Sequence, residues 1–95
     1  MKLKKLNEPL TIGDLEFKNR MVMPPLVIWK SDESAEVKDI HLRHYASCAG
    51  PGLMIVEATT VSPDGKLHEN QLGIFDDRHI EGLSKLASTI LNSGA

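Results

Sequence analysis

The stretch NRMVMPPLVIWKSDE, residues 19–33, decides how the first part of this chain folds. Its apolar run up to Met23 resembles a strand, but Pro24 and Pro25 follow it directly. A proline has no backbone N–H and cannot donate to a sheet ladder, so the strand must stop there. The sequence therefore predicts a short buried strand that ends at Pro24, followed by a stiff segment with free carbonyl groups.

Around this strand the chain alternates between strands and helices. Residues 9–20 contain two short apolar runs separated by Gly13-Asp14, which is a hairpin signal. From Glu36 onward, apolar residues recur near helical spacing, and Asp39 is a candidate N-cap. Gly50-Pro51-Gly52 ends this predicted helix.

The second strand has the clearest pattern in the chain. LMIVEA, from Leu53 to Ala58, has no polar residue before Glu57, as expected for a strand covered on both faces in a parallel sheet. The segment TTVSPDGKLHENQLG, residues 59–73, is rich in turn-forming residues and predicts a long functional loop.

A second helix follows this loop, with Asp76 or Asp77 as its cap and Gly94 just past its end. Its apolar residues keep to one face: Ile80, Leu83, Leu86, Ala87, Ile90 and Leu91. The predicted order is hairpin, strand, loop, helix, strand, long loop, helix, which indicates the α/β class. Two helices are too few to cover a parallel sheet, so the residues look like the opening of a larger α/β protein.

The composition narrows the classes of partner. The chain has 95 residues, 41% of them hydrophobic, and a net charge of −2, so nothing favours nucleic acid or an anionic membrane as a partner. A small-molecule substrate is the better expectation. No stretch approaches the roughly 18 to 20 apolar residues of a membrane span, and no apolar segment follows the basic start, which predicts a cytoplasmic protein. The single Cys48 agrees with a reducing compartment.

The spacing of the histidine and cysteine residues does not indicate a metal site or a reactive cysteine. His41 and His44 could share a helix face, but no carboxylate or cysteine stands at a recognisable ligand spacing from the chain's histidines, which also include His68 and His79. We therefore predict no metal site. Cys48 falls on the apolar stripe of the first helix and is expected to be a small buried hydrophobe.

The strand ends hold the better candidates, because ligands of parallel α/β folds bind at the carboxyl ends of strands. Glu57 could serve such a site, or it could be held by loop amides or a basic residue. The Pro24-Pro25 pair could contact a flat ligand or simply terminate the strand. Trp29 lies in the following loop, either as a core anchor or as a ring that faces a ligand. Both interpretations of each feature stay open on these grounds.

Three segments together resemble a known family. PLTIGDLEFKNRMVMPP, HLRHYASCAGPGLMIVEATTVSPDGK and LGIFDDRHIEGLSKL resemble, in order and spacing, the N-terminal part of the Old Yellow Enzyme family of NAD(P)H:flavin oxidoreductases. The resemblance runs from Pro9 to Gly94. Its most specific parts are KNR at residues 18–20, EAT at residues 57–59, and the run from Leu72 to Ile80.

The resemblance implies a (β/α)8 TIM barrel with FMN at the carboxyl ends of its strands and an N-terminal β-hairpin that closes the opposite end. Residues 1–95 would form the N-terminal segment of one FMN-binding domain, roughly the first two of eight β/α units. The family's catalytic residues are expected beyond Ala95. The 95 residues alone are therefore expected to be inactive.

The family's contacts to the cofactor transfer to five residues here: Pro24, Pro25, Leu26, Val27 and Ala58. The resemblance implies that Pro24 to Leu26 pack along the isoalloxazine and that Ala58 approaches the polar edge of the ring. Val27 replaces a threonine or cysteine that commonly tunes the flavin, and valine cannot do so by hydrogen bonding. Trp29 falls where relatives often place an aromatic near the substrate.

The function implied is an FMN-dependent oxidoreductase that takes electrons from NAD(P)H and reduces activated alkenes or similar acceptors by hydride transfer. Formation of a homo-oligomer is left open. The alternative is a truncated, non-catalytic α/β module that acts by associating with another chain through its exposed sheet edges.

Overall fold

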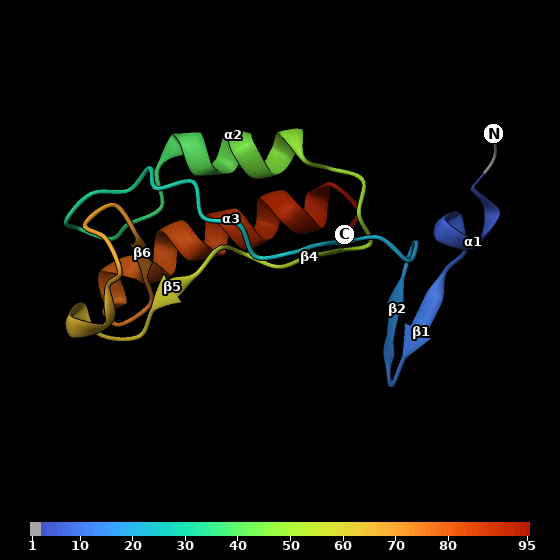
Figure 1. Ribbon diagram of the computed structural model, residues 1–95, viewed down its shortest axis with the longest axis horizontal. Coiled ribbons are helices and arrows are strands. Elements are labelled where there is room, and N and C mark those ends of the chain that lie inside the picture. The colour runs from blue at the N-terminus through green and yellow to red at the C-terminus, as the bar shows by residue number, and fades with distance from the viewer. Residues whose placement is uncertain (1–2) are drawn as a thin grey trace.

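The computed structural model describes residues 3–95, and residues 1 and 2 lie outside this range. Figure 1 shows two helices side by side along one face of an extended strand layer, with a hairpin at one end. The elements in chain order are α1 (Lys4–Asn7), β1 (Leu10–Ile12), β2 (Leu15–Phe17), β3 (Val22–Met23), α2 (Asp39–Ser47), β4 (Leu53–Met54), β5 (Thr59–Thr60), η1 (Pro63–Gly65), β6 (Leu72–Gly73), η2 (Asp77–His79) and α3 (Ile80–Asn92). This order contains the predicted alternation and adds α1, β5 and β6, which the sequence did not predict.

The predicted hairpin is present. β1 and β2 pair antiparallel with Leu10 opposite Phe17, and Gly13 in the connecting turn has a φ of 59° that glycine adopts without steric cost. Figure 1 places the hairpin at the opposite end of the molecule from the loops that follow β3 and β5. This arrangement agrees with a hairpin that closes the end of a barrel away from the ligand site.

β3 and β4 pair in parallel, with Val22 opposite Leu53 and Met23 opposite Met54. Leu53 N–H donates to Met21 O at 3.4 Å, and Ile55 N–H donates to Met23 O at 3.0 Å. Parallel bonds repeat every two residues, so the next donor on the first strand would be residue 25, which is a proline. The prolines therefore end the ladder at the pair formed by Met23 and Met54.

This early end corrects the predicted second strand. We predicted a strand from Leu53 to Ala58, but only Leu53–Met54 pairs regularly, and β5 starts after Ala58. The predicted long loop contains a further short pair, since β5 and β6 are parallel with Thr59 opposite Leu72. The sequence pattern did not predict β6.

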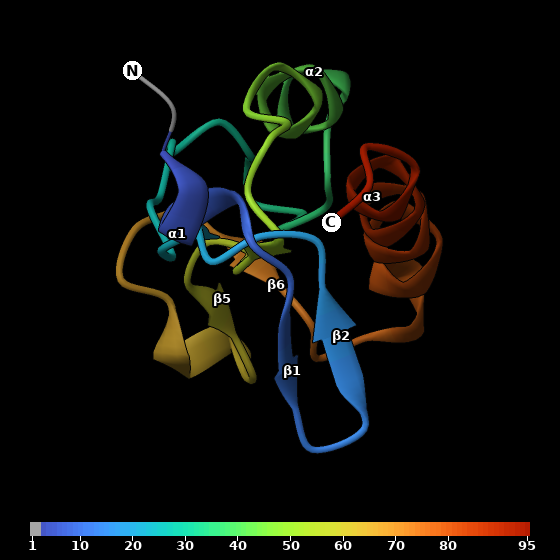
Figure 2. The same ribbon diagram turned by 90° about the vertical axis from the view of Figure 1, so that its right-hand side faces the viewer.

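The two long helices cover the strand layer and form the core with it. Helices α2 and α3 contact each other, and Figure 2 shows α2 above the strands and α3 beside them. The buried core residues are Tyr45, Met54, Leu86 and Ile90. Cys48 packs against them as predicted, but it is half-buried rather than buried.

The caps of the helices were predicted in part. Asp76 caps the turn before α3, because its carboxylate accepts a hydrogen bond from Arg78 N–H, and Gly94 follows the helix with a φ of 97°. The prediction of Asp39 as N-cap of α2 is wrong. Asp39 is the first helical residue and Lys38 is the N-cap, where the His41 ring accepts the Lys38 N–H at 2.9 Å.

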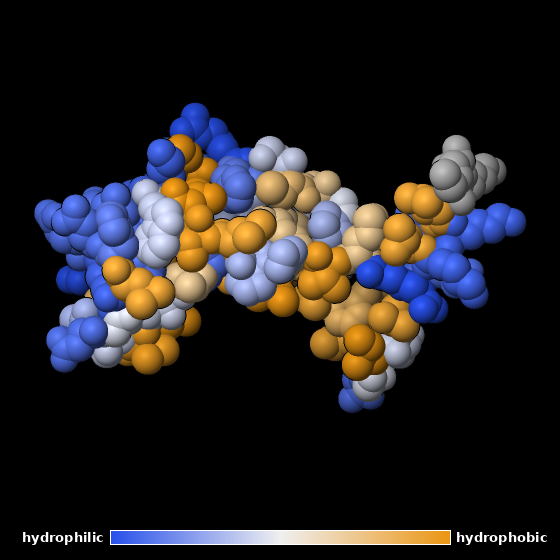
Figure 3. Space-filling model, in the orientation of Figure 1, coloured by the Kyte–Doolittle hydropathy of each residue, from blue (hydrophilic) through white to orange (hydrophobic). Residues whose placement is uncertain are grey.

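The strand layer leaves many apolar side chains exposed. Figure 3 shows hydrophobic surface across the middle of the molecule and on the hairpin. The exposed apolar residues of the strands and the segments beside them include Ile12, Leu15, Val22, Leu26, Leu53, Ile55 and Ile74. Within residues 3–95, no helix has the length and apolar character needed to cross a membrane.

Candidate functional site

The two predicted ligand-facing segments lie at the carboxyl ends of neighbouring parallel strands. Met23 is opposite Met54, and Val27 and Ala58 each come four residues after one of these paired residues. Figure 1 shows both segments running in the same direction beyond β3 and β4. Pro24, Pro25 and Ala58 are exposed, and Val27 is half-buried. The predicted cofactor residues, Pro24 to Val27 and Ala58, therefore follow the carboxyl ends of two paired parallel strands, and we call this edge the rim.

Most backbone groups at the end of the second segment already have partners. Glu57 N–H donates to the Tyr45 hydroxyl at 2.8 Å, and the Glu57 carbonyl accepts from Thr59 Oγ1 at 2.8 Å. The Ala58 carbonyl accepts from the side-chain amide of Gln71 at 3.2 Å. Within residues 3–95, however, the Ala58 N–H has no acceptor. One directed donor is thus left at an exposed strand end.

The segment after the first strand also has backbone N–H groups without an acceptor. Among the described residues, the N–H groups of Leu26 and Val27 make no hydrogen bond with the chain. Unpaired backbone polar groups are normally satisfied by protein, water or a ligand. The rim therefore combines free donors with the apolar surface of two prolines and Leu26. This combination suits a flat ligand that has hydrogen-bond acceptors at its edge.

A buried polar cluster supports this rim from behind. The Tyr45 hydroxyl donates to Glu57 Oε2 at 3.0 Å, and His41 Nε2 lies 3.8 Å from Glu57 Oε1. The side chains of His41 and Glu57 are fully buried. These contacts decide between the two interpretations of Glu57. Its carboxylate faces the interior, and it acts on the rim through its backbone.

Burial dominates the protonation of this cluster. It raises the pKa of Glu57, against the hydrogen bond from Tyr45, the charge of His44 and the backbone amide of Ile28. Burial also lowers the pKa of His41 and raises the pKa of Tyr45 to about 12. The tyrosine therefore keeps its hydroxyl proton and the histidine is held in its neutral form.

Trp29 lies in the loop that follows the rim, with 39% of its surface exposed. Its φ of 55° is in the left-handed region, which is strained for a large side chain. The ring tilts against His68 with centroids 5.3 Å apart, so the loops after both strands meet there. Partial exposure favours a ring that faces a ligand over a core anchor.

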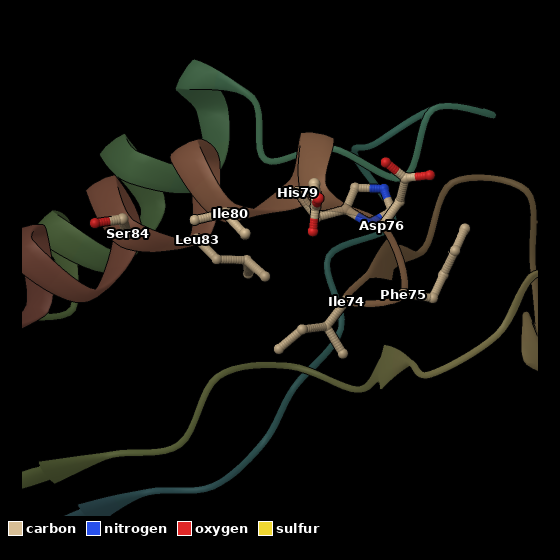
Figure 4. A pocket seen from close by; sticks show the side chains of 8 residues that line it. Ile74, Phe75, Asp76, His79, Ile80, Leu83 and Ser84 are labelled. Atoms are coloured by element: carbon tan, nitrogen blue, oxygen red, sulfur yellow. The ribbon is translucent and has the colours of Figure 1, made fainter.

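A separate hollow lies away from the rim, at the start of α3. It has a volume of about 810 Å³ and is lined by Ile74, Phe75, Asp76, Asp77, His79, Ile80, Leu83 and Ser84. Figure 4 shows Ile74, Ile80 and Leu83 pointing into the same space between α3 and the strand segments. It is an open apolar face that includes none of the predicted rim residues.

The four histidines do not gather into a metal site. Across residues 3–95, no three histidine, cysteine, aspartate or glutamate side chains lie close enough to hold a metal ion. His79 is buried instead beside the Ser34 carbonyl, with Nε2 and that oxygen 2.8 Å apart. His41 belongs to the cluster behind the rim, and His68 contacts Trp29.

Comparison with known proteins places this arrangement in a family. The model of the NADH:flavin oxidoreductase / NADH oxidase family matches residues 5–95. This chain belongs to that family. An NADPH dehydrogenase from Clostridium acetobutylicum is 41% identical over 93 residues, which is 96% of this chain and 27% of that protein.

Solved Old Yellow Enzymes of the flavin oxidoreductase family share the fold. The homologue from Zymomonas mobilis has a TM-score of 0.88 at 28% identity, covering 96% of this chain and 26% of the other. The Old Yellow Enzyme from Pichia sp. AKU4542 has a TM-score of 0.86 at 32% identity, covering 95% and 24%. The chain spans about a quarter of the length of these relatives.

These findings confirm the predicted fold class, the N-terminal part of a TIM barrel with a β-hairpin. They also confirm membership of the Old Yellow Enzyme family and its cofactor pair, FMN with NAD(P)H as reductant. The roles of individual rim residues stay predictions.

Sequence reasoning missed two residues that hold the rim, Tyr45 and Gln71. Gln71 is buried in the loop and bridges two backbone groups, since its side chain also accepts from Leu67 N–H at 2.7 Å. Nothing local in the sequence marks it. The four-residue spacing of His41 and Tyr45 on one helix could have indicated a shared polar face toward Glu57.

Proposed function

We propose that the protein containing this chain is an FMN-dependent NAD(P)H oxidoreductase of the Old Yellow Enzyme type, which reduces activated alkenes or similar acceptors. Family membership supports the reaction class. The observation that carries the site assignment is that, within residues 3–95, the Ala58 N–H and the amides of Leu26 and Val27 have no acceptor at the ends of two neighbouring parallel strands.

The residues present fit FMN by the chemistry of their donors. Pro24 and Pro25 offer rigid apolar surface, and the amides of Val27 and Ala58 offer donors for the carbonyl and nitrogen acceptors of an isoalloxazine edge. The chemistry that FMN supplies when bound is hydride transfer from NAD(P)H to an acceptor. The chain's own part is to bind the ring on a stiff edge and to orient it.

Trp29 would face the substrate rather than the cofactor. It belongs to the loop after the rim and keeps part of its ring exposed. Its contact with His68 fixes the ring against the long loop after the second strand. The proposal therefore assigns Trp29 to substrate preference and leaves flavin binding to the strand ends.

The 95 residues alone should not oxidise NAD(P)H. The strand layer exposes apolar residues such as Val22, with 52% of its surface accessible, and Leu53, with 37%. Exposed sheet edges and apolar surface of this kind favour association. Light scattering on residues 1–95, with an assay of FMN-dependent NAD(P)H consumption, tests this; a monomer that turns over would contradict it.

The complete product of the gene tests the function directly. After purification it should show flavin absorbance, with release of FMN on denaturation, and should consume NAD(P)H in the presence of an activated alkene. A protein that binds no FMN even when the cofactor is added would refute the assignment.

A further inference from the structure

We propose that Tyr45, Glu57 and His41 form a positioning network that fixes the end of the second strand, so that the Ala58 N–H is presented to FMN. The inference rests on the proposed flavin site at this rim. None of the three side chains reaches the exposed surface, since all are at most 2% exposed. They would act on the cofactor only through the backbone.

Two hydrogen bonds join Glu57 to the hydroxyl of Tyr45. Tyr45 Oη accepts Glu57 N–H at 2.8 Å and donates to Glu57 Oε2 at 3.0 Å. Both the backbone and the side chain of Glu57 are thus tied to one atom of α2. Because the ladder between the strands stops at the prolines, this pair replaces strand pairing as the restraint on residue 57.

His41 completes the network with a defined tautomer. Its Nδ1 accepts the Lys38 N–H at 2.9 Å, so the neutral ring carries its proton on Nε2. That proton faces Glu57 Oε1 across 3.8 Å, and neither atom has another partner. An ionised Glu57 carboxylate accepts the Tyr45 hydrogen bond on Oε2, and its Oε1 is attracted to the facing His41 N–H dipole at a separation too long for a hydrogen bond. A protonated Oε1 would face an N–H and could donate to nothing there.

The residue after Glu57 is held from a second direction. The side-chain amide of Gln71 donates to the Ala58 carbonyl at 3.2 Å. Tyr45 and Gln71 therefore restrain the backbone on both sides of the Glu57–Ala58 peptide, and within residues 3–95 the Ala58 N–H has no acceptor.

Two variants of the complete gene product separate positioning from mere stability. Tyr45→Phe removes only the hydroxyl, and we expect the Kd of FMN for the apo-protein to rise about tenfold, with a shift of the bound flavin's visible bands. Ile90→Val is the matched control, since it trims a buried residue of the same core as Tyr45 and removes none of the network's hydrogen bonds. It should lower the thermal midpoint and leave the Kd and the spectrum unchanged.

His41→Gln decides the question if Tyr45→Phe does not fold. A glutamine at this helix position can still accept the Lys38 N–H, as in a capping box, but it removes the imidazole that faces Glu57. We expect its FMN Kd and flavin spectrum to shift in the same direction as those of Tyr45→Phe.

The outcomes distinguish this inference from the proposed function. A wild-type protein that binds no FMN refutes the flavin site itself. A wild-type protein that binds FMN, with variants that lose only thermal stability while Kd and spectrum stay at wild-type values, overturns the positioning role and leaves the flavin site standing.

Discussion

The Tyr45 hydroxyl both accepts the N–H of Glu57 and donates to its carboxylate, at 2.8 Å and 3.0 Å. In a continued parallel ladder, the N–H of residue 57 would instead pair with the first strand. Pro25 lacks the donor that the ladder needs at its position, so the strands separate and α2 takes over the restraint. The prolines and the buried tyrosine are thus two parts of one arrangement.

Tyr45→Phe should lower the free energy of unfolding by about 1 to 3 kcal/mol, because it leaves the buried N–H and Oε2 of Glu57 without partners. Chemical denaturation of the complete gene product measures this change. Tyr45→Leu should lower the free energy of unfolding further, since it also removes part of the buried ring. If the phenylalanine variant is as stable as the wild type, the hydrogen bonds contribute nothing and water or movement compensates for them.

The features that the sequence could predict depend on residues close together in the chain. The hairpin follows from Gly13, the strand end from Pro24 and Pro25, and α3 from its regular apolar stripe. The length of the second strand was wrong because the missing donor belongs to Pro25, about 30 residues earlier, and only the pairing register reveals it.

The supporting side chains were beyond sequence reasoning for the same reason. In the sequence Tyr45 looks like an ordinary core residue. Only the structure shows that its hydroxyl bonds to Glu57, twelve positions away. β6 has two residues, and its pattern carries no strand periodicity. The rim residues Pro24 to Val27 and Ala58 were identified by resemblance to a family, and the structure adds which of their backbone groups are free.

Gly52→Ala should destabilise the protein although alanine is only one methyl group larger. A Cβ at Gly52 would lie 2.6 Å from the backbone oxygen of Asn19, and the backbone there cannot give way easily. Asn19 also accepts the Gly52 N–H at 2.7 Å, so a shift would cost that bond. We expect a loss of about 1 to 3 kcal/mol in the free energy of unfolding.

Gly13→Ala is the contrasting substitution for Gly52→Ala. No atom lies within 4 Å of a Cβ at Gly13, so its cost comes only from the φ of 59° in the turn. Gly13→Asn should recover most of that cost, because asparagine tolerates this conformation. The same recovery should fail at Gly52. Equal effects of asparagine at both positions would contradict the steric explanation.

His41 should make the protein less stable in mild acid. Burial lowers the pKa of His41 below the ordinary value of 6.5, so between these two values the unfolded chain binds more protons than the folded one. The contribution of His41 to the free energy of unfolding is therefore fully present above pH 6.5 and decreases as the pH falls below this value. Glu57 acts with the opposite sign, since its raised pKa means that stability falls as the pH rises above 4.5.

His41→Gln isolates the histidine term from this sum. The thermal midpoint of the wild type relative to the variant should decrease between pH 7 and pH 5, because the variant has nothing to protonate at position 41. Measurements at constant ionic strength keep the contributions of Lys38 and His44, which also act on His41, comparable. A difference that stays constant across this range would show that His41 titrates normally in the folded protein.

Trp29→Ala should raise KM or change acceptor preference while flavin content stays near that of the wild type. Alanine at this position keeps a residue with a Cβ in the strained φ of 55°, so any change reports loss of the ring rather than relief of backbone strain. Trp29→Phe keeps an aromatic ring and should therefore change KM or acceptor preference less than Trp29→Ala does. A variant that loses stability with no specific change in KM would instead support the core-anchor interpretation.

Ala58→Leu should weaken FMN binding by at least about tenfold, because a larger side chain beside the exposed Ala58 amide keeps the ring from approaching it. Ala87→Leu, on an exposed position of α3, is the matched control and should leave the Kd unchanged. Titration of the apo-protein with FMN, followed by quenching of flavin fluorescence, measures both. Equal affinity of the Ala58→Leu variant and the wild type would remove Ala58 from the site, whatever the family resemblance implies.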